Sequence, residues 1–199
     1  MILDATAGNQ TMWLVKYTHN IIYIDMERKL KRKPTVYADN TNTPFPDAIF
    51  DTVFYDPPHK WGGKDDPCPM YPSEVKKYKQ EHVPFAFTYY GWDKYKTRIG
   101  LIRHVYFAQK EFIRILKPDG LLWFKWNEVG IPLDRIMVCF TDWIELMRLY
   151  VNDPTHTASQ HQTFWLVMQK KEKIKQQSAL DDFVGEHQNL SSGLQPAKL

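Results

Sequence analysis

A carboxylate followed by two prolines and an imidazole, Asp56-Pro57-Pro58-His59, is the stretch of this sequence best suited to chemistry. Consecutive prolines fix φ near about −65° and stiffen the turn, so Asp56, the Pro57 carbonyl and the His59 ring would keep a fixed relative geometry. Two rigid hydrogen-bond acceptors beside a flat ring suit a planar substrate that carries an amino group. The alternative is a tight turn with a capping acid and no chemistry.

The residues before Asp56 predict the element that positions it. Residues 52–55 are β-branched or aromatic, and they favour a buried strand. That strand must end at Pro57, because proline lacks the N–H group that a strand ladder needs. Asp56 is therefore expected at the carboxyl end of a strand, which is the edge where open α/β sheets bind ligands.

Three further predicted strands are each followed by an aspartate: residues 1–3 by Asp4, residues 20–24 by Asp25 and residues 35–38 by Asp39. In a parallel sheet these carboxyl groups would gather with Asp56 along one edge. An acid in the position of Asp25 commonly accepts hydrogen bonds from ribose hydroxyls, and it could equally cap a helix. The basic run over residues 29–33 predicts a solvated helix face, with phosphate contact as the alternative.

A loop of small residues, Asp4-Ala5-Thr6-Ala7-Gly8, follows the first strand, and helical character is predicted from about Gln10. Such a loop lets backbone N–H groups approach a ligand closely, with the helix N-terminus behind them. A dinucleotide-binding loop needs three glycines in the spacing G-x-G-x-x-G, whereas Gly8 stands alone, so pyrophosphate binding is disfavoured. A strand-capping turn without a ligand stays open as the alternative.

Taken together, these residues resemble the core of the class I S-adenosylmethionine-dependent methyltransferases, and in particular small phage and microbial members. The 4–8 loop resembles the cofactor loop, Asp25 the ribose-binding acid, and Asp39 the residue near the adenine amino group. Asp56 to His59 resembles the [D/N/S]-P-P-aromatic motif of enzymes that methylate exocyclic amino groups, with His59 where Tyr, Phe or Trp is usual. Residues 115–124 are similar to the Leu-Lys-Pro-Gly-Gly turn and fifth strand of the same superfamily.

The resemblance implies an α/β fold: a Rossmann-like three-layer sandwich with a mostly parallel seven-stranded sheet whose last strand is antiparallel. It implies S-adenosyl-L-methionine as cofactor, bound by Asp4, Ala5, Thr6, Ala7, Gly8, Asp25, Met26, Asp39, Asn40 and Asp56. The catalytic residues would be Asp56, Pro57, Pro58 and His59. Asp56 and the Pro57 carbonyl would draw the amine lone pair out of conjugation toward the methyl group, while His59 stacks on the base.

An insert at about residues 60–98 interrupts the strand pattern with many lysines, aromatic residues, glycines and prolines. Cations interleaved with flat rings suit a single-stranded or flipped-out nucleotide, because phosphates are neutralised while bases stack. The predicted substrate-binding residues are Trp61, Tyr90 and Trp92, together with Lys125 and Asn127 after the insert. The alternative is a solvated excursion whose aromatic side chains pack locally.

The remaining chain predicts one domain over residues 1–170 and a polar C-terminal tail over 171–199. Within the domain, apolar side chains recur every three or four positions over residues 102–116, which predicts an amphipathic helix. Further elements are expected as follows: strands over 121–126, 143–151 and 163–168, and a short helix over 133–140.

The composition of the chain indicates which kinds of partner and which compartment to expect. The net charge of +3 over 199 residues is compatible with nucleic acid without requiring it. We expect no membrane partner, because no run of about 18 apolar residues and no leader occurs. Cys68 and Cys139 are far apart and predict reduced thiols of a cytoplasmic protein. We expect no metal, because His156 and His161 lack neighbouring acids or cysteines and are predicted to face solvent.

Three functions stay open on the sequence. The first is methylation of an exocyclic amino group of a DNA or RNA base. The second is methylation of a small molecule or a protein side chain, which the absence of a separate target-recognition domain favours. The third is a non-catalytic, cofactor-binding partner subunit. The sequence does not predict the oligomeric state.

Overall fold

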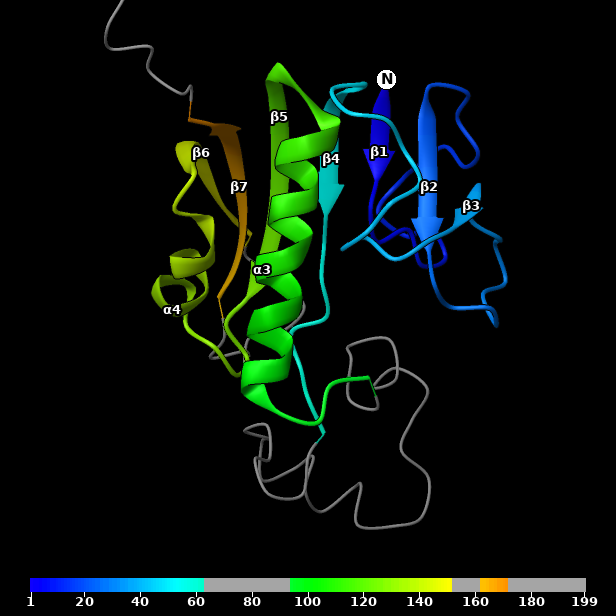
Figure 1. Ribbon diagram of the computed structural model, residues 1–199. Helices are drawn as coiled ribbons and strands as arrows, with labels where there is room; N and C mark the ends of the chain where they lie inside the picture. Colours follow the sequence, from blue (N-terminus) through cyan, green and yellow to red (C-terminus); the bar gives the residue numbers. More distant parts are fainter. Residues whose placement is uncertain (63–93, 152–161, 172–199) are drawn as a thin grey trace, which may run out of the picture.

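The computed structural model describes residues 1–62, 94–151 and 162–171, and its centre is a seven-stranded sheet of order β3-β2-β1-β4-β5-β7-β6 (Figure 1). The strands are β1 (Ile2–Asp4), β2 (Ile21–Asp25), β3 (Val36–Tyr37), β4 (Phe50–Tyr55), β5 (Leu116–Asn127), β6 (Trp143–Val151) and β7 (Thr163–Lys170). Strands β1 to β5 pair in parallel, whereas β7 pairs antiparallel with both β5 and β6. The predicted fold class, including the antiparallel last strand, is confirmed.

The central strands alternate between two faces of the sheet. Val53 and Tyr55 of β4 are fully buried on one face, in a single core with Phe124 of β5. On the other face, Phe54 and Trp123 are half-buried, with ring centroids 5.6 Å apart and an interplanar angle of 24°. Successive side chains of a strand point to opposite faces, so β4 and β5 can be apolar throughout and still separate two layers.

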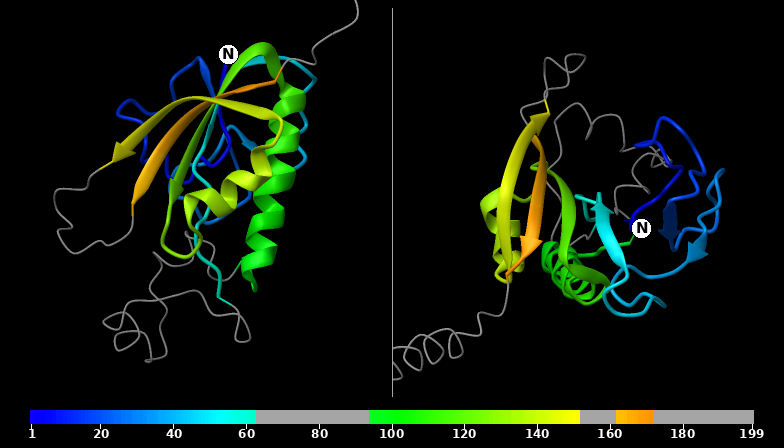
Figure 2. Two further views of the ribbon diagram at one scale, coloured as in Figure 1. Left: turned by 90° about the vertical axis from the view of Figure 1, so that its left-hand side faces the viewer. Right: turned by 90° about the horizontal axis from the view of Figure 1, so that it is seen from above.

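Helices cover the first of these faces (Figure 2). Helix α3 (Arg98–Ile115) begins at Thr97, whose side chain accepts a hydrogen bond from Gly100 N, and its buried stripe includes Leu101, Val105 and Phe112. The short helix α4 (Leu133–Met137) and the 3₁₀ turn η1 (Val138–Phe140) follow β5. Both helical predictions, over 102–116 and 133–140, are confirmed. In the described ranges, no helix is both long and apolar enough to cross a membrane.

Two helical predictions on the opposite face are wrong. The segment after Gln10 forms turns, because Gln10 and Tyr17 adopt φ values of 58° and 55°, in the left-handed region that a right-handed helix cannot contain. The basic run over 29–33 also forms turns. Its backbone N–H groups at Lys31 and Arg32 donate to Asn9 Oδ1, at 2.9 and 3.2 Å, instead of to helical carbonyls. The third layer therefore consists, in the described residues, of turns.

Candidate active site

The loop over residues 4–8 lies at the centre of the carboxyl edge of the sheet and contacts three neighbouring segments. Three hydrogen bonds join it to neighbouring strand ends: Gly8 N to Asp25 Oδ2 at 2.9 Å, Asn40 Nδ2 to Ala5 O at 3.0 Å, and Asp56 N to Thr6 Oγ1 at 2.8 Å. Gly8 has a φ of +48°, which side chains rarely tolerate. The structure thus brings together the ends of β1, β2 and β4 and the segment after β3, as parallel pairing requires.

Asp4 lies at the base of this edge and is 1% exposed. Its carboxylate accepts hydrogen bonds from Trp13 Nε1 at 2.7 Å and from Thr6 N at 3.1 Å. Burial raises the pKa of Asp4 to about 6, against the lowering effect of these two bonds, and the negative charges of Asp56 and Asp25 raise it further. The carboxylates of Asp56 and Asp25 therefore lie near enough to Asp4 to disfavour its ionised form.

Asp25 accepts hydrogen bonds from two backbone segments, the 4–8 loop and the turn that follows β2. Its Oδ2 accepts Gly8 N, and its Oδ1 accepts Glu27 N at 2.8 Å. No helix follows Asp25, so the helix-capping alternative is wrong. An ionised carboxylate offers about four acceptor positions, which leaves acceptor capacity for ligand hydroxyls. The neighbouring Met26 side chain is 49% exposed beside it.

Asp39 and Asn40 follow β3: Asn40 contacts the 4–8 loop through Ala5 O, whereas the titratable neighbours of Asp39 are His104 and Lys94. Burial raises the pKa of Asp39, but hydrogen bonds from Thr41 N at 2.9 Å and Thr41 Oγ1 at 2.8 Å outweigh it, so the pKa is lowered overall. Asn40 is buried, and its Oδ1 has no hydrogen-bond partner among the described residues. A buried acceptor without a donor is costly, and it suits a ligand that supplies an N–H group.

Asp56 forms an ion pair that the sequence reasoning missed. Lys125 Nζ donates to Asp56 Oδ2 at 2.7 Å, and the two side chains are 33% and 34% exposed. Burial raises the pKa of Asp56, and the charge and hydrogen bond of Lys125 lower it. The β4–β5 register, in which Tyr55 lies beside Phe124, places Asp56 next to Lys125. Aligning the two predicted strands by their apolar runs could have found the pair.

The motif after Asp56 leaves the sheet with trans peptide bonds. Pro57 is buried, while Pro58 and His59 are half-buried. Trp61, predicted to stack on substrate, is only 2% exposed and packs in the hydrophobic core, so contact with a ligand would require it to move. Gly62 N donates to the Tyr95 carbonyl at 2.9 Å, which joins the two ends of the insert.

The other predicted substrate residues are divided between described and undescribed parts of the chain. Tyr90 and Trp92 lie outside the described residues, as do Cys68, His156, His161 and residues 172–199 of the tail. Asn127 is engaged structurally: its Nδ2 donates to Thr163 Oγ1 at 2.7 Å, and its Oδ1 accepts Val129 N at 3.0 Å. These bonds fix the end of β5 against β7, and a substrate role for Asn127 stays a prediction.

Comparisons with known proteins bear on the fold. No family model matches the chain, and no curated protein does. Among solved structures, the PH0226 protein from Pyrococcus horikoshii OT3 is similar, with a TM-score of 0.52 and 10% sequence identity, over 85% of this chain and 81% of that chain. The sheet topology and this likeness fit a class I methyltransferase fold.

Within this methyltransferase-like fold, a polar cluster near Asp39 was also missed. Tyr95 and His104 have ring centroids 5.2 Å apart, and burial lowers the pKa of His104 to about 4, so the imidazole is neutral near pH 7. Tyr55 Oη, Tyr95 Oη and His104 Nε2 are buried without hydrogen-bond partners in the described part of the chain. The sequence feature that could have indicated this cluster is His104, a polar residue that lies one helical turn from both Leu101 and Ala108 in the apolar stripe of α3.

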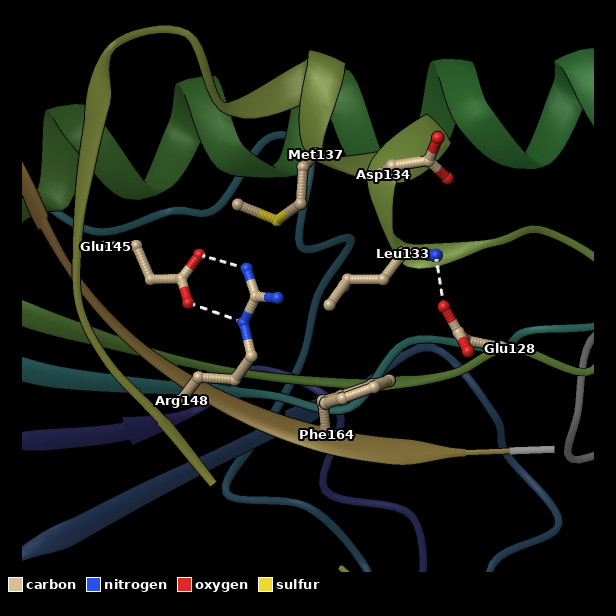
Figure 3. A pocket seen from close by; sticks show the side chains of 7 residues that line it. All are labelled: Glu128, Leu133, Asp134, Met137, Glu145, Arg148 and Phe164. Atoms are coloured by element: carbon tan, nitrogen blue, oxygen red, sulfur yellow. Dashed lines mark hydrogen bonds and ion pairs between the residues drawn. The ribbon is translucent and has the colours of Figure 1, made fainter. Parts of the chain in front are cut away.

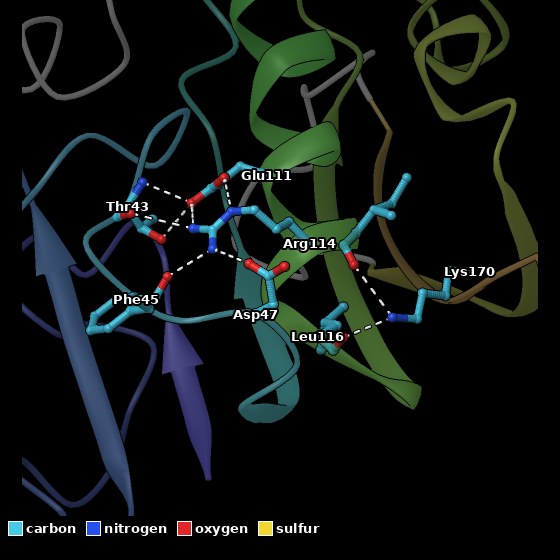
Figure 4. A network of polar contacts seen from close by, with 8 residues as sticks. Thr43, Phe45, Asp47, Glu111, Arg114, Leu116 and Lys170 are labelled. Atoms are coloured by element: carbon cyan, nitrogen blue, oxygen red, sulfur yellow. Dashed lines mark hydrogen bonds and ion pairs between the residues drawn. The ribbon is translucent and has the colours of Figure 1, made fainter.

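An ion-pair network around the buried Glu111 anchors the segment that carries Asp39 (Figure 4). Glu111 of α3 is 8% exposed, and its Oε1 accepts Thr43 N at 2.8 Å and Thr43 Oγ1 at 2.6 Å. Arg114 donates to the other Glu111 oxygen at 2.9 Å, to Phe45 O at 2.8 Å and to Asp47 Oδ1 at 2.6 Å. The α3 helix therefore fixes the position of the loop between β3 and β4.

No group of three or more His, Cys, Asp and Glu side chains within the described ranges has the arrangement of a metal site. Cys139 is a buried free thiol, and burial raises its pKa to about 11. Such a thiol is protonated near neutral pH and is a weak nucleophile.

Proposed function

We propose that this protein is an S-adenosyl-L-methionine-dependent methyltransferase that acts on an exocyclic amino group of a nucleic-acid base. The observation that carries the proposal is the position of Asp56: its backbone N–H is bound to the 4–8 loop, and its carboxylate is fixed by Lys125 at the same sheet edge. Because consecutive prolines stiffen the run Asp56-Pro57-Pro58, the Asp56 carboxylate and the Pro57 carbonyl form a rigid pair of hydrogen-bond acceptors beside the small-residue loop 4–8.

The residues present fit an adenosine-bearing cofactor. Asp25 has acceptor capacity for ribose hydroxyls, and the unpartnered Oδ1 of Asn40 would accept an N–H of the adenine amino group. Gly8 allows close approach of the backbone. When bound, S-adenosyl-L-methionine would supply an electrophilic methyl group on a sulfonium.

Asp56 and the Pro57 carbonyl would orient the acceptor amine. Because Lys125 holds Oδ2, Asp56 Oδ1 is the oxygen placed to accept an N–H bond from the substrate. A second N–H bond to the Pro57 carbonyl would turn the nitrogen lone pair away from the ring and toward the methyl group. As the nitrogen gains a bond it becomes positively charged, and a fixed carboxylate stabilises that charge in the transition state. As the nitrogen–carbon bond forms, the bond between the methyl carbon and the sulfonium sulfur would break and leave a neutral thioether. Asp56 Oδ1, which accepts the N–H bond, would take the proton released from nitrogen and pass it to water, and the product would be a neutral methylamine.

The direct test is transfer of a tritiated methyl group from labelled cofactor to a panel of DNA, RNA and cell extract. We expect label on nucleic acid, and Asp56→Asn should abolish transfer. Label confined to protein or to small molecules would replace the nucleic-acid acceptor with the second function. Cofactor binding without transfer to any acceptor would instead support a non-catalytic subunit.

Calorimetry with S-adenosyl-L-methionine separates the roles of the two acids. Asp25→Ala should weaken binding by at least about tenfold, because the ribose acceptor is lost. Asp56→Asn should leave binding close to that of the wild type. Asp134→Asn is a matched control, since Asp134 on α4 is 76% exposed in its side chain. Equal loss of binding in the Asp25 and Asp56 variants would contradict the proposed division of roles.

Affinity for nucleic acid can be measured by gel shift across a salt series. Phosphate contacts release counterions, so the affinity of a basic protein for DNA or RNA falls steeply as salt rises. Binding that does not change with salt would count against a nucleic-acid acceptor.

A further inference from the structure

Strand β6 is an edge strand with unusual exposure. It comes last in the sheet order, and no other strand in the described ranges pairs with its outer edge. Six of its apolar side chains are between 41% and 53% exposed: Ile144, Leu146, Met147, Leu149, Tyr150 and Val151. Natural edge strands are usually protected by shortness, proline, lysine or other charges, or a bulge. This nine-residue strand has a bulge and two charged residues that pair with each other, but no lysine or proline, and its apolar side chains stay exposed.

The two charged residues of β6 lie on its helix-bearing face. A bulge between Glu145 and Met147 shifts the register, so Glu145 and Arg148 point to the same face. Arg148 donates from Nε to Glu145 Oε1 at 2.6 Å and from Nη2 to Oε2 at 2.7 Å. Figure 3 shows this pair facing Met137 and Phe164 across a groove of about 440 Å³.

The opposite face of β6 is apolar. Ile144, Met147 and Leu149 pair with β7 residues of the face that α3 does not cover, among them Val167 and Trp165. The strand thus presents an apolar row on one face, an opposite-charge pair on the other, and, in the described part of the chain, an outer edge that no other strand pairs with. Backbone groups at an edge need a partner strand or water.

We propose that β6 pairs antiparallel with β6 of a second copy of this chain, about a two-fold axis between Leu146 and Met147. In this register Glu145 lies opposite Arg148 of the second copy, and this opposition occurs twice because a two-fold interface is self-complementary. On the other face Ile144 lies opposite Leu149. The existing pairs within each strand and the new pairs between strands form a ring of four alternating charges.

Charge complementarity selects this register over its neighbours. A two-fold axis at residue 145 or at residue 148 sets like charges opposite each other, which is destabilising. A register shifted so that Ile144 faces Met147 leaves Glu145 opposite Leu146, with the charge facing an apolar side chain. Only pairing about the point between Leu146 and Met147 matches charge with charge and apolar with apolar along the strand.

The interface lies at the end of the sheet away from β1 and β2, and no predicted site residue lies on β6. Pairing would join the two seven-stranded sheets into one continuous sheet and leave both candidate active sites open. The inference therefore stands or falls independently of the proposed methyltransferase activity.

Sedimentation velocity of the full chain over a roughly hundredfold range of concentration tests the proposal, because a dimer must dissociate on dilution by mass action. We expect a dimer at the higher concentrations. Glu145→Arg alone sets four positive charges together, and Arg148→Glu alone sets four negative charges together. Each single variant should dimerise at least about tenfold more weakly than the wild type.

A mixture of the two single variants is the decisive measurement. In the mixed pair, the arginine introduced at position 145 of one chain would lie opposite the glutamate introduced at position 148 of the other. The native Arg148 of the first chain would lie opposite the native Glu145 of the second, so an equimolar mixture should dimerise like the wild type. Arg103→Glu, an exposed charge reversal on α3, should dimerise normally. Thermal melting by circular dichroism checks that every variant is folded.

Three outcomes overturn the proposal. If the wild-type protein stays monomeric at every concentration, β6 does not pair with a second copy, and an extended segment of another protein becomes the candidate partner of this edge. Single variants that dimerise as well as the wild type would place the interface elsewhere. A variant mixture that stays monomeric would exclude the register in which Glu145 meets Arg148.

Discussion

Replacing Lys125 with methionine should raise the pKa of Asp56. The pair has an N–O distance of 2.7 Å, and an opposite charge at such a distance lowers a carboxyl pKa by roughly 1–3 units. Because both side chains are about one third exposed, solvent screens the pair and weakens this effect. In Lys125→Met the pKa of Asp56, which burial already raises, should rise further, because the charge and the hydrogen bond that lower it are lost.

Carbon-13 NMR titration of the aspartate carboxyl groups measures this shift, with Asp56→Asn assigning the resonance. Lys117→Met is a matched control, because Lys117 Nζ donates to Asp51 Oδ1 at the same 2.7 Å. Its loss should raise the pKa of Asp51, which Lys117 and the N-terminus hold at about 2, and should leave Asp56 unchanged. An unchanged Asp56 pKa in Lys125→Met, or an equal Asp56 shift in Lys117→Met, would refute the reasoning.

Lys125→Met should also change how the stability of the protein depends on pH, and the sign of that change follows from the pKa of Asp56. A carboxyl whose pKa is higher in the folded than in the unfolded protein binds more protons when folded, so stability falls as pH rises between the two values. Lys125→Met widens this window for Asp56. The variant should therefore lose more stability than the wild type as pH rises from about 4 toward neutrality.

Glu111→Ala should lower the free energy of unfolding in urea by about 2–4 kcal/mol, because it leaves buried donors without an acceptor, while Lys110→Ala on the exposed face of the same helix should cost under about 0.5 kcal/mol. Trp13→Phe removes a donor from Asp4. Since the pKa of Asp4 is already raised from 3.8 to about 6, its ionisation costs roughly 3 kcal/mol above pH 6, and that cost should grow in the variant at pH 7 but vanish near pH 3. Equal destabilisation of Trp13→Phe at both pH values would contradict this. Cys139→Ala should be labelled by a thiol reagent in the folded state to the same extent as the wild type, because the Cys139 thiol is buried, and stronger labelling of the wild type would contradict this.

The strands could be predicted from the sequence because their signal is local. Apolar and β-branched runs ending in acid or proline located β1, β2 and β4 to within one or two residues. The segment after Gln10 could not be predicted this way, since its conformation depends on contacts distant in the sequence. Trp13 bonds Asp4, and Asn9 binds the backbone of residues 31 and 32.

The candidate site was predictable in part for the same reason. Strand ends are local features, so their acids could be placed at one edge once the sheet was taken as parallel. The Asp56–Lys125 pair depends on the register between β4 and β5, which no single segment of sequence determines. Trp61 shows the limit of composition: an aromatic residue in a lysine-rich insert reads as a stacking surface, yet it is buried in the core.

The electrostatics of the sheet edge give a physical reason to expect a cationic ligand there. Burial makes the ionised form of Asp4 unfavourable, and repulsion by the charges of Asp56 and Asp25 adds to this cost. Backbone donors and Lys125 offset this repulsion only in part, so the arrangement lowers the stability of the fold. Such local costs persist chiefly at functional sites. A ligand with a positive centre and hydrogen-bond donors would relieve the repulsion, and a sulfonium-bearing nucleoside has both.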